Sequence, residues 1–269
     1  MRSCVSRSRY RSAALCASVV AIVAHRSHAL SGSGAVAAFA VGTATFGAGS
    51  RYATVLFAFF VTSTLLSRAG RAKKRTLAAT HKGGPRDGMQ VLANGGVATI
   101  CALVHAALPA DSAARRRTRA AFAGAYAAAN ADTWATEIGT LARGRPRSIV
   151  TAQPLEPGLS GGVTILGTLA EIAGAGWIAL IAAAVFDERQ GTLTRATAIG
   201  GIAGATFDSI LGAVLQERRY CASCDRMTET TPHACGAATS PAGGVSWVSN
   251  DVVNFAATAA GAALAASLA

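Results

Sequence analysis

Charged side chains are scarce in this chain. Only 14% of its 269 residues are Asp, Glu, Lys or Arg, whereas soluble domains usually carry about 25%. Hydrophobic residues make up 51%, and the mean hydropathy is +0.38. The polar residues lie in short clusters between apolar runs instead of along amphipathic faces. The scarcity of charge excludes an ordinary water-exposed surface and indicates an integral membrane protein.

Lysine is the rarest of the charged residues. The three lysines are Lys73, Lys74 and Lys82. None of them follows a glycine-rich loop in the order that a P-loop nucleotide site requires. The sequence therefore excludes an enzyme of the P-loop class.

Aromatic residues are also few, at 6% of the chain, although its net charge is +12. A basic protein can bind the phosphates of nucleic acid, but here no aromatic side chains for base stacking lie among the basic clusters. Those clusters, at residues 2–11, 68–75, 115–119 and 143–147, border apolar runs, as membrane topology signals do. We therefore expect a lipid bilayer, and no nucleic acid, as a partner.

Eight apolar segments follow one another along the chain. A full membrane span needs about 20 residues, so the first three segments are short and the last five are the clearer spans. The pattern predicts an all-α, polytopic transmembrane bundle of about seven or eight helices, with residues 1–269 forming a single multi-pass domain. The segments are 12–25, 35–49, 53–67, 89–109, 119–142, 162–185, 196–215 and 250–268.

The first segment has an alternative interpretation. A basic stretch precedes it, and Ser27-His28-Ala29 resembles the small-residue cleavage site of a signal peptide. The sequence leaves open whether residues 1–29 are cleaved.

The distribution of Lys and Arg between the loops predicts the topology. With eight crossings, one side of the membrane carries 14 basic residues and the other carries 11. The positive-inside rule then places the 68–88 loop and the 216–249 loop in the cytoplasm and both termini outside. We expect the plasma membrane of a prokaryote, with the motif loops cytoplasmic.

Small residues recur at four-residue spacing in and beside the apolar runs. Gly158 with Gly162, and Gly200 with Gly204, are examples. Such spacing lets membrane helices approach closely, so these glycines are expected to serve helix packing.

Ionisable and amide side chains occur inside the apolar segments, where they are costly and often functional. Carboxylates and amides from several helices form a donor set for a hard cation such as Mg²⁺, while interhelical hydrogen bonds are the structural alternative. Asp132 and Glu137 point about 140° apart on a straight helix, so they would serve different partners unless the helix is broken. The residues expected to act in catalysis are Asp132, Glu137, Asp208, Asp251 and Asn254; Glu171 is equally compatible with either role.

Two glycine-rich stretches precede apolar segments and are suited to binding phosphate. In the first, Lys82 and Arg86 supply charge; in the second, Ser160, Gly161 and Gly162 lie where a helix would begin. Glycines allow a backbone to approach an anion, and a helix N-terminus offers free N–H groups. An ordinary basic turn beside the membrane is the alternative for the first stretch.

The 216–249 loop contains three thiols and one imidazole within 15 residues. Cys221, Cys224, His233 and Cys235 have the types and spacing of a structural Zn²⁺ site. A disulfide would compete if this loop were extracellular. The sequence thus predicts a small zinc-binding insert at residues 216–249.

Six stretches together resemble a known membrane family of unknown function, the one that includes animal transmembrane protein 19 and the plant phytyl-phosphate kinase of tocopherol synthesis. The cysteine cluster resembles its prokaryotic members. The stretches are residues 82–87 (Lys-Gly-Gly-Pro-Arg-Asp), 91–96 (Val-Leu-Ala-Asn-Gly-Gly), 130–139 (Asn-Ala-Asp-Thr-Trp-Ala-Thr-Glu-Ile-Gly), 157–164 (Pro-Gly-Leu-Ser-Gly-Gly-Val-Thr), 206–213 (Thr-Phe-Asp-Ser-Ile-Leu-Gly-Ala) and 250–254 (Asn-Asp-Val-Val-Asn).

The order of these motifs is also similar, more distantly, to that of the dolichol and phytol kinases. The resemblance implies transfer of phosphate from a nucleoside triphosphate, CTP by analogy, to an isoprenoid lipid. It implies that Asp132, Asp208 and Asp251 hold Mg²⁺ on the phosphates. Lys82, Arg86 and the Ser160 turn would cradle those phosphates.

Two other functions fit the same residues. A lipid-phosphate transporter or flippase would use the intramembrane carboxylates without a nucleotide, and a non-enzymatic membrane scaffold would use them for packing. The sequence does not determine the isoprenoid length, the choice between CTP and ATP, the choice between alcohol and monophosphate acceptor, or the oligomeric state.

Overall fold

The computed structural model describes residues 2–69, 84–110, 112–187 and 191–269. In this part of the chain, eight helices form a bundle, which confirms the predicted helical class. The helices are α1 (Arg2–Arg26), α2 (Gly32–Ala48), α3 (Ser50–Arg68), α5 (Gly88–Ala107), α6 (Ala113–Gly139), α7 (Ile165–Val185), α8 (Thr192–Val214) and α9 (Asn250–Ser267).

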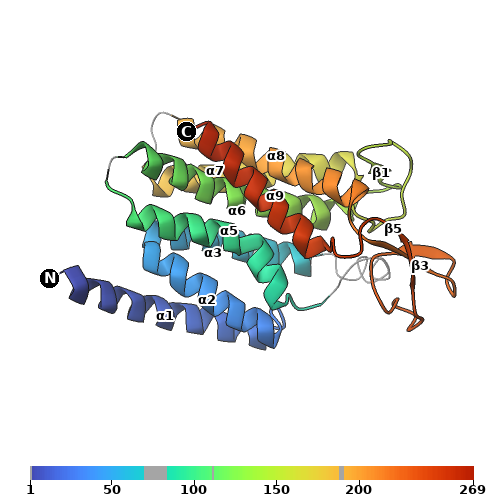
Figure 1. The fold of residues 1–269 in the computed structure, drawn as a ribbon, viewed down its shortest axis with the longest axis horizontal. Helices are drawn as coiled ribbons and strands as arrows, with labels where there is room; N and C mark the ends of the chain where they lie inside the picture. Colours follow the sequence, from blue (N-terminus) through green and yellow to red (C-terminus); the bar gives the residue numbers. More distant parts are fainter. Residues whose placement is uncertain (1, 70–83, 111, 188–190) are drawn as a thin grey trace.

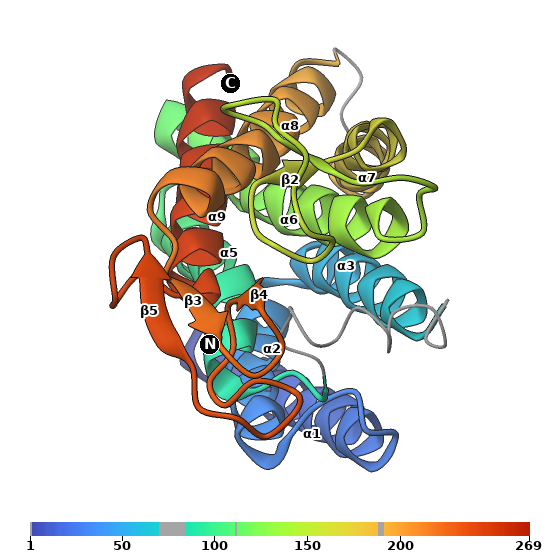
Figure 2. The same cartoon turned by 90° about the vertical axis from the view of Figure 1, so that its right-hand side faces the viewer.

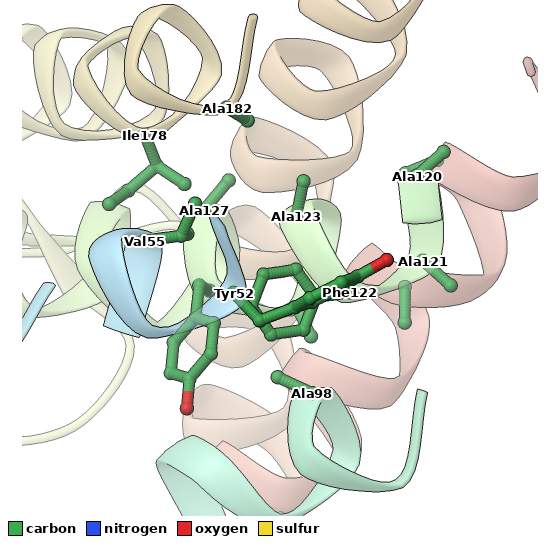
Figure 3. Packing of buried hydrophobic residues seen from close by; sticks show 14 of the residues in the cluster. Tyr52, Val55, Ala98, Ala120, Ala121, Phe122, Ala123, Ala127, Ile178 and Ala182 are labelled. Atoms are coloured by element: carbon green, nitrogen blue, oxygen red, sulfur yellow. The ribbon is translucent and has the colours of Figure 1, made fainter. Parts of the chain in front are cut away.

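Helix α6 is the centre of the bundle. Every residue from 120 to 131 is buried, and α3, α5, α7, α8 and α9 all pack against this helix. Most of these residues are alanine, whose small side chain lets neighbouring backbones approach closely. Figure 3 shows Ala123 and Ala127 of α6 facing Ile178 and Ala182 of α7.

Glycines line the tightest contacts of the bundle. A Cβ on Gly204 of α8 would lie 2.6 Å from Ala128 Cβ, and one on Gly200 would lie 2.6 Å from the carbonyl oxygen of Gly261. The packing role expected for Gly200 and Gly204 is therefore confirmed. The same expectation is wrong for Gly158 and Gly162, because neither lies in a helix: Gly162 begins strand β2 (Gly162–Val163) and Gly158 precedes it in a turn.

The outer helices present apolar side chains outward. Among the described residues, α5, α7 and α8 are long and apolar enough to cross a membrane. Ile100 of α5 and Ile165 and Leu180 of α7 are exposed on the outside of the bundle, as lipid-facing side chains are. The more polar composition of α6 follows from its position, because a helix enclosed by other helices meets no lipid.

Successive helices run in opposite directions, so the connecting segments lie at the two ends of the bundle. Both termini lie at one end of the molecule (Figure 1). The connections after α1, α6 and α8, and residues 84–87 before α5, lie at the other end, with two small antiparallel sheets, as Figures 1 and 2 show. One sheet pairs β1 (Arg147–Ser148) with β2, and the other has the order β4 (Arg226–Thr228), β3 (Arg218–Cys221), β5 (Ser240–Gly243). The predicted motif loops therefore share one end of the bundle.

Polar side chains cap the N-termini of the helices that begin at this end. Ser31, Thr164 and Ser249 each accept a backbone N–H as the N-cap of α2, α7 and α9. Asp87 forms a capping box with Gln90 at the start of α5. These caps define where each motif loop ends and its helix begins.

A substitution of Gly204 by Ala tests the close packing around α6. The new methyl group would collide with α6, and overpacking of this kind costs about 1–3 kcal/mol. We expect a lower unfolding midpoint for Gly204→Ala in detergent. Gly176→Ala on α7 is the matched control: nothing lies within 4 Å of its Cβ position, so we expect it to be neutral or stabilising. Equal midpoints for the two variants would contradict the packing.

Candidate functional site

Three acidic side chains from three helices converge near the end that carries the motif loops. They are Asp132 of α6, Glu171 of α7 and Asp208 of α8, and their carboxyls are close enough to interact electrostatically with one another. Thr206 Oγ1 donates to Glu171 Oε1 at 2.8 Å. Asp208 Oδ2 is buried and has no hydrogen-bond partner among the described residues. The cluster therefore gathers three carboxyl groups, one of which has an oxygen without a hydrogen-bond partner among the described residues.

Glu137 lies on another side of α6, as the helical spacing predicts. Ser67 Oγ of α3 donates to Glu137 Oε1 at 2.5 Å, and Arg86 Nη2 donates to the same Ser67 oxygen at 3.3 Å. Helix α6 continues without a break from Ala113 to Gly139. Asp132 and Glu137 thus face different partners.

Arg86 is held by its backbone as well as its side chain. Its N–H donates to Ala29 O at 3.0 Å, and its carbonyl accepts from Ser31 N at 2.9 Å. The guanidinium reaches Ser67 and the charge of Glu137. Arg86 therefore joins the α1–α2 turn to α3 and α6. The other predicted cation of this loop, Lys82, lies outside the described residues.

Ser160 and Gly161 form a turn that packs on the end of α8. Gly161 has φ +79°, and a Cβ there would lie 2.4 Å from Ala213 Cβ, so only glycine fits. Across the contact, Gly212 of α8 lies against Ser160. Gly162 continues into β2, which precedes α7. The turn is thus fixed next to the helix that carries Asp208.

Glu229, which the sequence interpretation did not select, occupies this turn. Its carboxylate accepts from Ser160 N at 2.7 Å, from Ser160 Oγ at 2.9 Å and from Gln216 Nε2 at 2.7 Å. Glu229 also interacts electrostatically with Asp208. The Ser160 N–H and hydroxyl, which were predicted to bind a phosphate, are therefore already bonded to the carboxyl group of Glu229.

Burial raises the pKa of the Glu229 carboxyl, while the hydrogen bonds from Ser160 and the charge of Arg218 oppose the rise. Arg218 donates to the carbonyl of Ala213 and so lies close to the same turn. The charged form of Glu229 is consequently the costlier one in the folded protein.

Asp251 and Asn254 begin α9 at the same end of the bundle. Asn254 is buried and Asp251 lies in the first turn, after the N-cap Ser249. The structure thus brings Asp132 and Asp208 together with Glu171 and places Asp251 at the same end of the bundle.

Asn130 of the α6 motif has a structural role. It is fully buried, its amide donates to Gly174 O at 2.8 Å, and its Oδ1 accepts from Thr62 Oγ1 at 3.2 Å. These bonds join α6 to α7 and α3, next to the position of Asp132.

The four cysteine and histidine residues of the 216–249 insert lie together. The ligand atoms of Cys221, Cys224, His233 and Cys235 are all within 4.8 Å of one another. The sulfurs of Cys221 and Cys235 are 3.7 Å apart, close to the edge of a tetrahedron with Zn–S bonds of about 2.3 Å. All three thiols are free, not disulfide-bonded. His233 Nδ1 lies 3.1 Å from Cys235 Sγ, and this contact contributes most to lowering the pKa of Cys235 to about 6.

The family model for "Integral membrane protein DUF92" matches residues 15–262. The chain belongs to this family. It is 32% identical to "Protein PGR" of Arabidopsis thaliana over 263 residues, which cover 90% of each chain. It is also 32% identical to "Uncharacterized membrane protein MJ0933" of Methanocaldococcus jannaschii over 201 residues, covering 74% of this chain and 80% of the relative. No solved structure gives a significant match.

The residues matched by the family model include the carboxylate cluster, the Ser160 turn and the cysteine insert. The names of the two relatives state no reaction.

A Glu229→Gln variant tests the internal pairing of Glu229 with the Ser160 turn. Because burial raises the pKa of Glu229, the wild-type protein loses stability as the pH rises from the unfolded value, about 4.5, through the folded value. We expect the neutral amide to avoid this loss. The unfolding midpoint of Glu229→Gln should therefore gain on that of the wild type as the pH rises above the unfolded value of about 4.5.

Glu156→Gln provides the control, because Glu156 lies in the same region and its ion pair with Arg145 is long, at 3.7 Å, and solvent-exposed. A midpoint difference between Glu229→Gln and the wild type that does not change with pH would contradict the pairing.

Proposed function

We propose that this chain is a membrane-embedded phosphotransferase that moves phosphate from a nucleoside triphosphate to an isoprenoid alcohol or monophosphate. The observation that carries the proposal is the meeting of Asp132, Glu171 and Asp208 next to the Ser160 turn. Carboxylates and an anion-binding turn side by side are the two parts that phosphate transfer needs, since its catalysis consists largely of positioning and charge neutralisation.

Mg²⁺ fits the carboxylate cluster. Like charges brought together in a low-dielectric site repel one another, and a cation removes that cost. The unpartnered Asp208 oxygen supplies a free ligand position, Asp132 supplies a second carboxylate, and Glu171 is a further candidate. When bound, the ion would neutralise charge on the phosphates.

The Ser160 turn would bind a phosphate of the nucleotide in place of Glu229. Ser160 N–H and Oγ–H already donate to two carboxylate oxygens, and phosphate oxygens accept the same bonds. In this proposal Glu229 occupies the turn in the resting protein and leaves when the nucleotide enters. Arg86, which lies near Glu137 of the helix that carries Asp132, would supply positive charge to the bound phosphates.

The acceptor is proposed from the resemblance to phytyl-phosphate kinase and, more distantly, to the dolichol and phytol kinases. An oxygen of the acceptor attacks the γ-phosphorus, and the nucleoside diphosphate leaves. A monophosphate acceptor has no alcohol proton to lose, so no general base is needed. CTP is the proposed donor by the same analogy. Because nucleotides are cytoplasmic, the end that carries the motif loops would face the cytoplasm of a prokaryotic cell.

The cysteine insert is proposed to hold a structural Zn²⁺. Cys221, Cys224, His233 and Cys235 provide four ligand atoms at tetrahedral spacing, in a segment with few apolar residues to support it. Strand β4, between these ligands, leads directly to Glu229. The metal would therefore fix the hairpin that places Glu229 on Ser160.

A lipid-phosphate transporter is the less favoured function. Transport needs a route through the bundle, but residues 120–131 of α6, at its centre, are all buried against the neighbouring helices. The carboxylates lie at one end of this packed core, as expected for chemistry at one membrane face.

Loss of the two cluster aspartates tests the proposed reaction. We expect Asp132→Asn and Asp208→Asn to lower phosphate transfer by at least about 100-fold, because each variant removes a cation ligand while keeping the side-chain shape. The assay uses purified protein with labelled CTP or ATP, Mg²⁺, and a panel of isoprenoid alcohols and monophosphates. Asp187→Asn, at the opposite end and exposed, is the control and should retain activity.

Wild-type protein that transfers no phosphate from either nucleotide to any acceptor, and shows no stabilisation by nucleotide with Mg²⁺, would contradict the reaction. Uptake of lipid phosphate into vesicles by the same preparation would then support transport. Cellular function unaffected by both aspartate substitutions would favour the scaffold.

Metal analysis tests the zinc proposal. We expect about one zinc per purified chain, and its loss in Cys224→Ser and His233→Ala, because each removes one of four ligands. Cys16→Ser, at an exposed position on α1, should keep the metal. Elemental analysis by mass spectrometry measures the content. A wild-type chain without zinc, or a disulfide found among these thiols by peptide mapping, would contradict the site.

A further inference from the structure

A second polar site lies at the opposite end of the bundle, where both termini are found (Figure 1). There the structure contains a cavity of about 560 Å³. Its walls come from α1, the α2–α3 junction, the end of α5, the start of α6 and Phe186 after α7. None of the predicted site residues that the structure describes is among the residues lining this cavity.

The cavity is lined by basic side chains. No acidic residue is among its described lining residues. Asp187 lies outside the lining and forms an ion pair with Arg51 at 2.8 Å. Asp111 and Glu188 are not among the described residues. Cations gathered in one cavity repel one another, and an anion bound between them removes this cost. The basic lining residues are Arg9, Arg51, His105, Arg115, Arg116 and Arg119.

Tyr52 adds an unsatisfied donor to this cavity. Its side chain is 4% exposed, and its hydroxyl is buried without a hydrogen-bond partner among the described residues. The ring is held by edge contacts with Phe122 and Phe186, at centroid distances of 4.7 and 5.1 Å. A buried hydroxyl without a partner is costly, so its presence in the wall points to a ligand that accepts its hydrogen.

The start of α3 also opens on the cavity. Gly49 and Ser50 line it, and the N-cap residue Gly49 offers no side-chain cap to the helix. The positive end of a helix attracts anions. Arginine, the tyrosine donor and the helix end therefore favour the same charge.

Several of the arginines are held in place. Arg9 donates to Ala48 O at 2.9 Å, Arg115 Nε donates to His105 Nε2 at 2.9 Å, and Arg119 lies over the Phe186 ring at 5.6 Å. Guanidinium groups held in this way are prepared to bind a planar or tetrahedral oxyanion with little loss of side-chain entropy.

We propose that this cavity binds a phosphate-bearing anion, with Tyr52 donating its hydroxyl hydrogen and the arginines neutralising the charge. The anion is either the headgroup of an anionic phospholipid or a free phosphate compound. The site is independent of the carboxylate cluster and binds its ligand without chemical change.

The test compares variants of the full purified chain in detergent by their unfolding midpoints. Short-chain phosphatidylglycerol, short-chain phosphatidylcholine and inorganic phosphate are titrated separately. We expect the wild type to be stabilised by at least one of the two anions and not by phosphatidylcholine. Arg51→Gln with Arg116→Gln should weaken the apparent affinity for that anion about tenfold, and Tyr52→Phe should weaken it about threefold.

Arg143→Gln with Arg226→Gln removes the same charge from exposed positions at the other end and serves as the control. Tyr52→Phe removes a hydroxyl that has no hydrogen-bond partner in the described part of the chain, so the midpoint of the variant without ligand should equal or exceed that of the wild type. Response to phosphatidylglycerol alone assigns a lipid headgroup, and response to both anions assigns a free phosphate. No response of the wild type, or equal affinities in the wild type and the cavity variants, would overturn the proposal.

Discussion

The close approach of helices to α6 is the constraint on which the rest of the structure depends. Alanine along α6 and glycine on α8 and α9 leave so little space that a single methyl group on Gly204 would collide with Ala128. This approach brings α7 and α8 near enough for Glu171 and Asp208 to interact with Asp132. Because no lipid reaches α6 and its neighbours supply the hydrogen bonds of Asn130, polar residues are tolerated near its end.

A second constraint is the contact between Glu229, which follows the small sheet, and the Ser160 turn of the membrane bundle. Glu229 follows β4 and accepts hydrogen bonds from the backbone N–H and the hydroxyl of Ser160. The Ser160 turn packs against α8, and only glycine fits at position 161 in that contact. The cysteine and histidine cluster surrounds the same hairpin. The insert thus brings Glu229 close enough to interact electrostatically with Asp208 of the carboxylate cluster. The Glu229 carboxyl group occupies the place proposed for a phosphate.

The apolar runs were sufficient to predict the fold class and the eight segments. Helical spacing was sufficient to predict the different directions of Asp132 and Glu137, because these depend only on positions along one helix. The cysteine grouping followed from local spacing in the same way. Glu229 could not be predicted, since no apolar pattern surrounds it and its partner Ser160 is 69 positions away in the chain. The packing role assigned to Gly158 and Gly162 failed because four-residue spacing does not reveal where a helix begins.

Binding of a cation-bridged phosphate at the Asp132–Asp208 cluster is tested most directly by a structure determined with Mg²⁺ and a non-hydrolysable CTP analogue. We predict an ion on Asp132 and Asp208, a phosphate bound by the Ser160 N–H and hydroxyl, and Glu229 displaced from that turn. A structure under the same saturating conditions with no ion at the two aspartates, and with Glu229 still bound to Ser160, would contradict it.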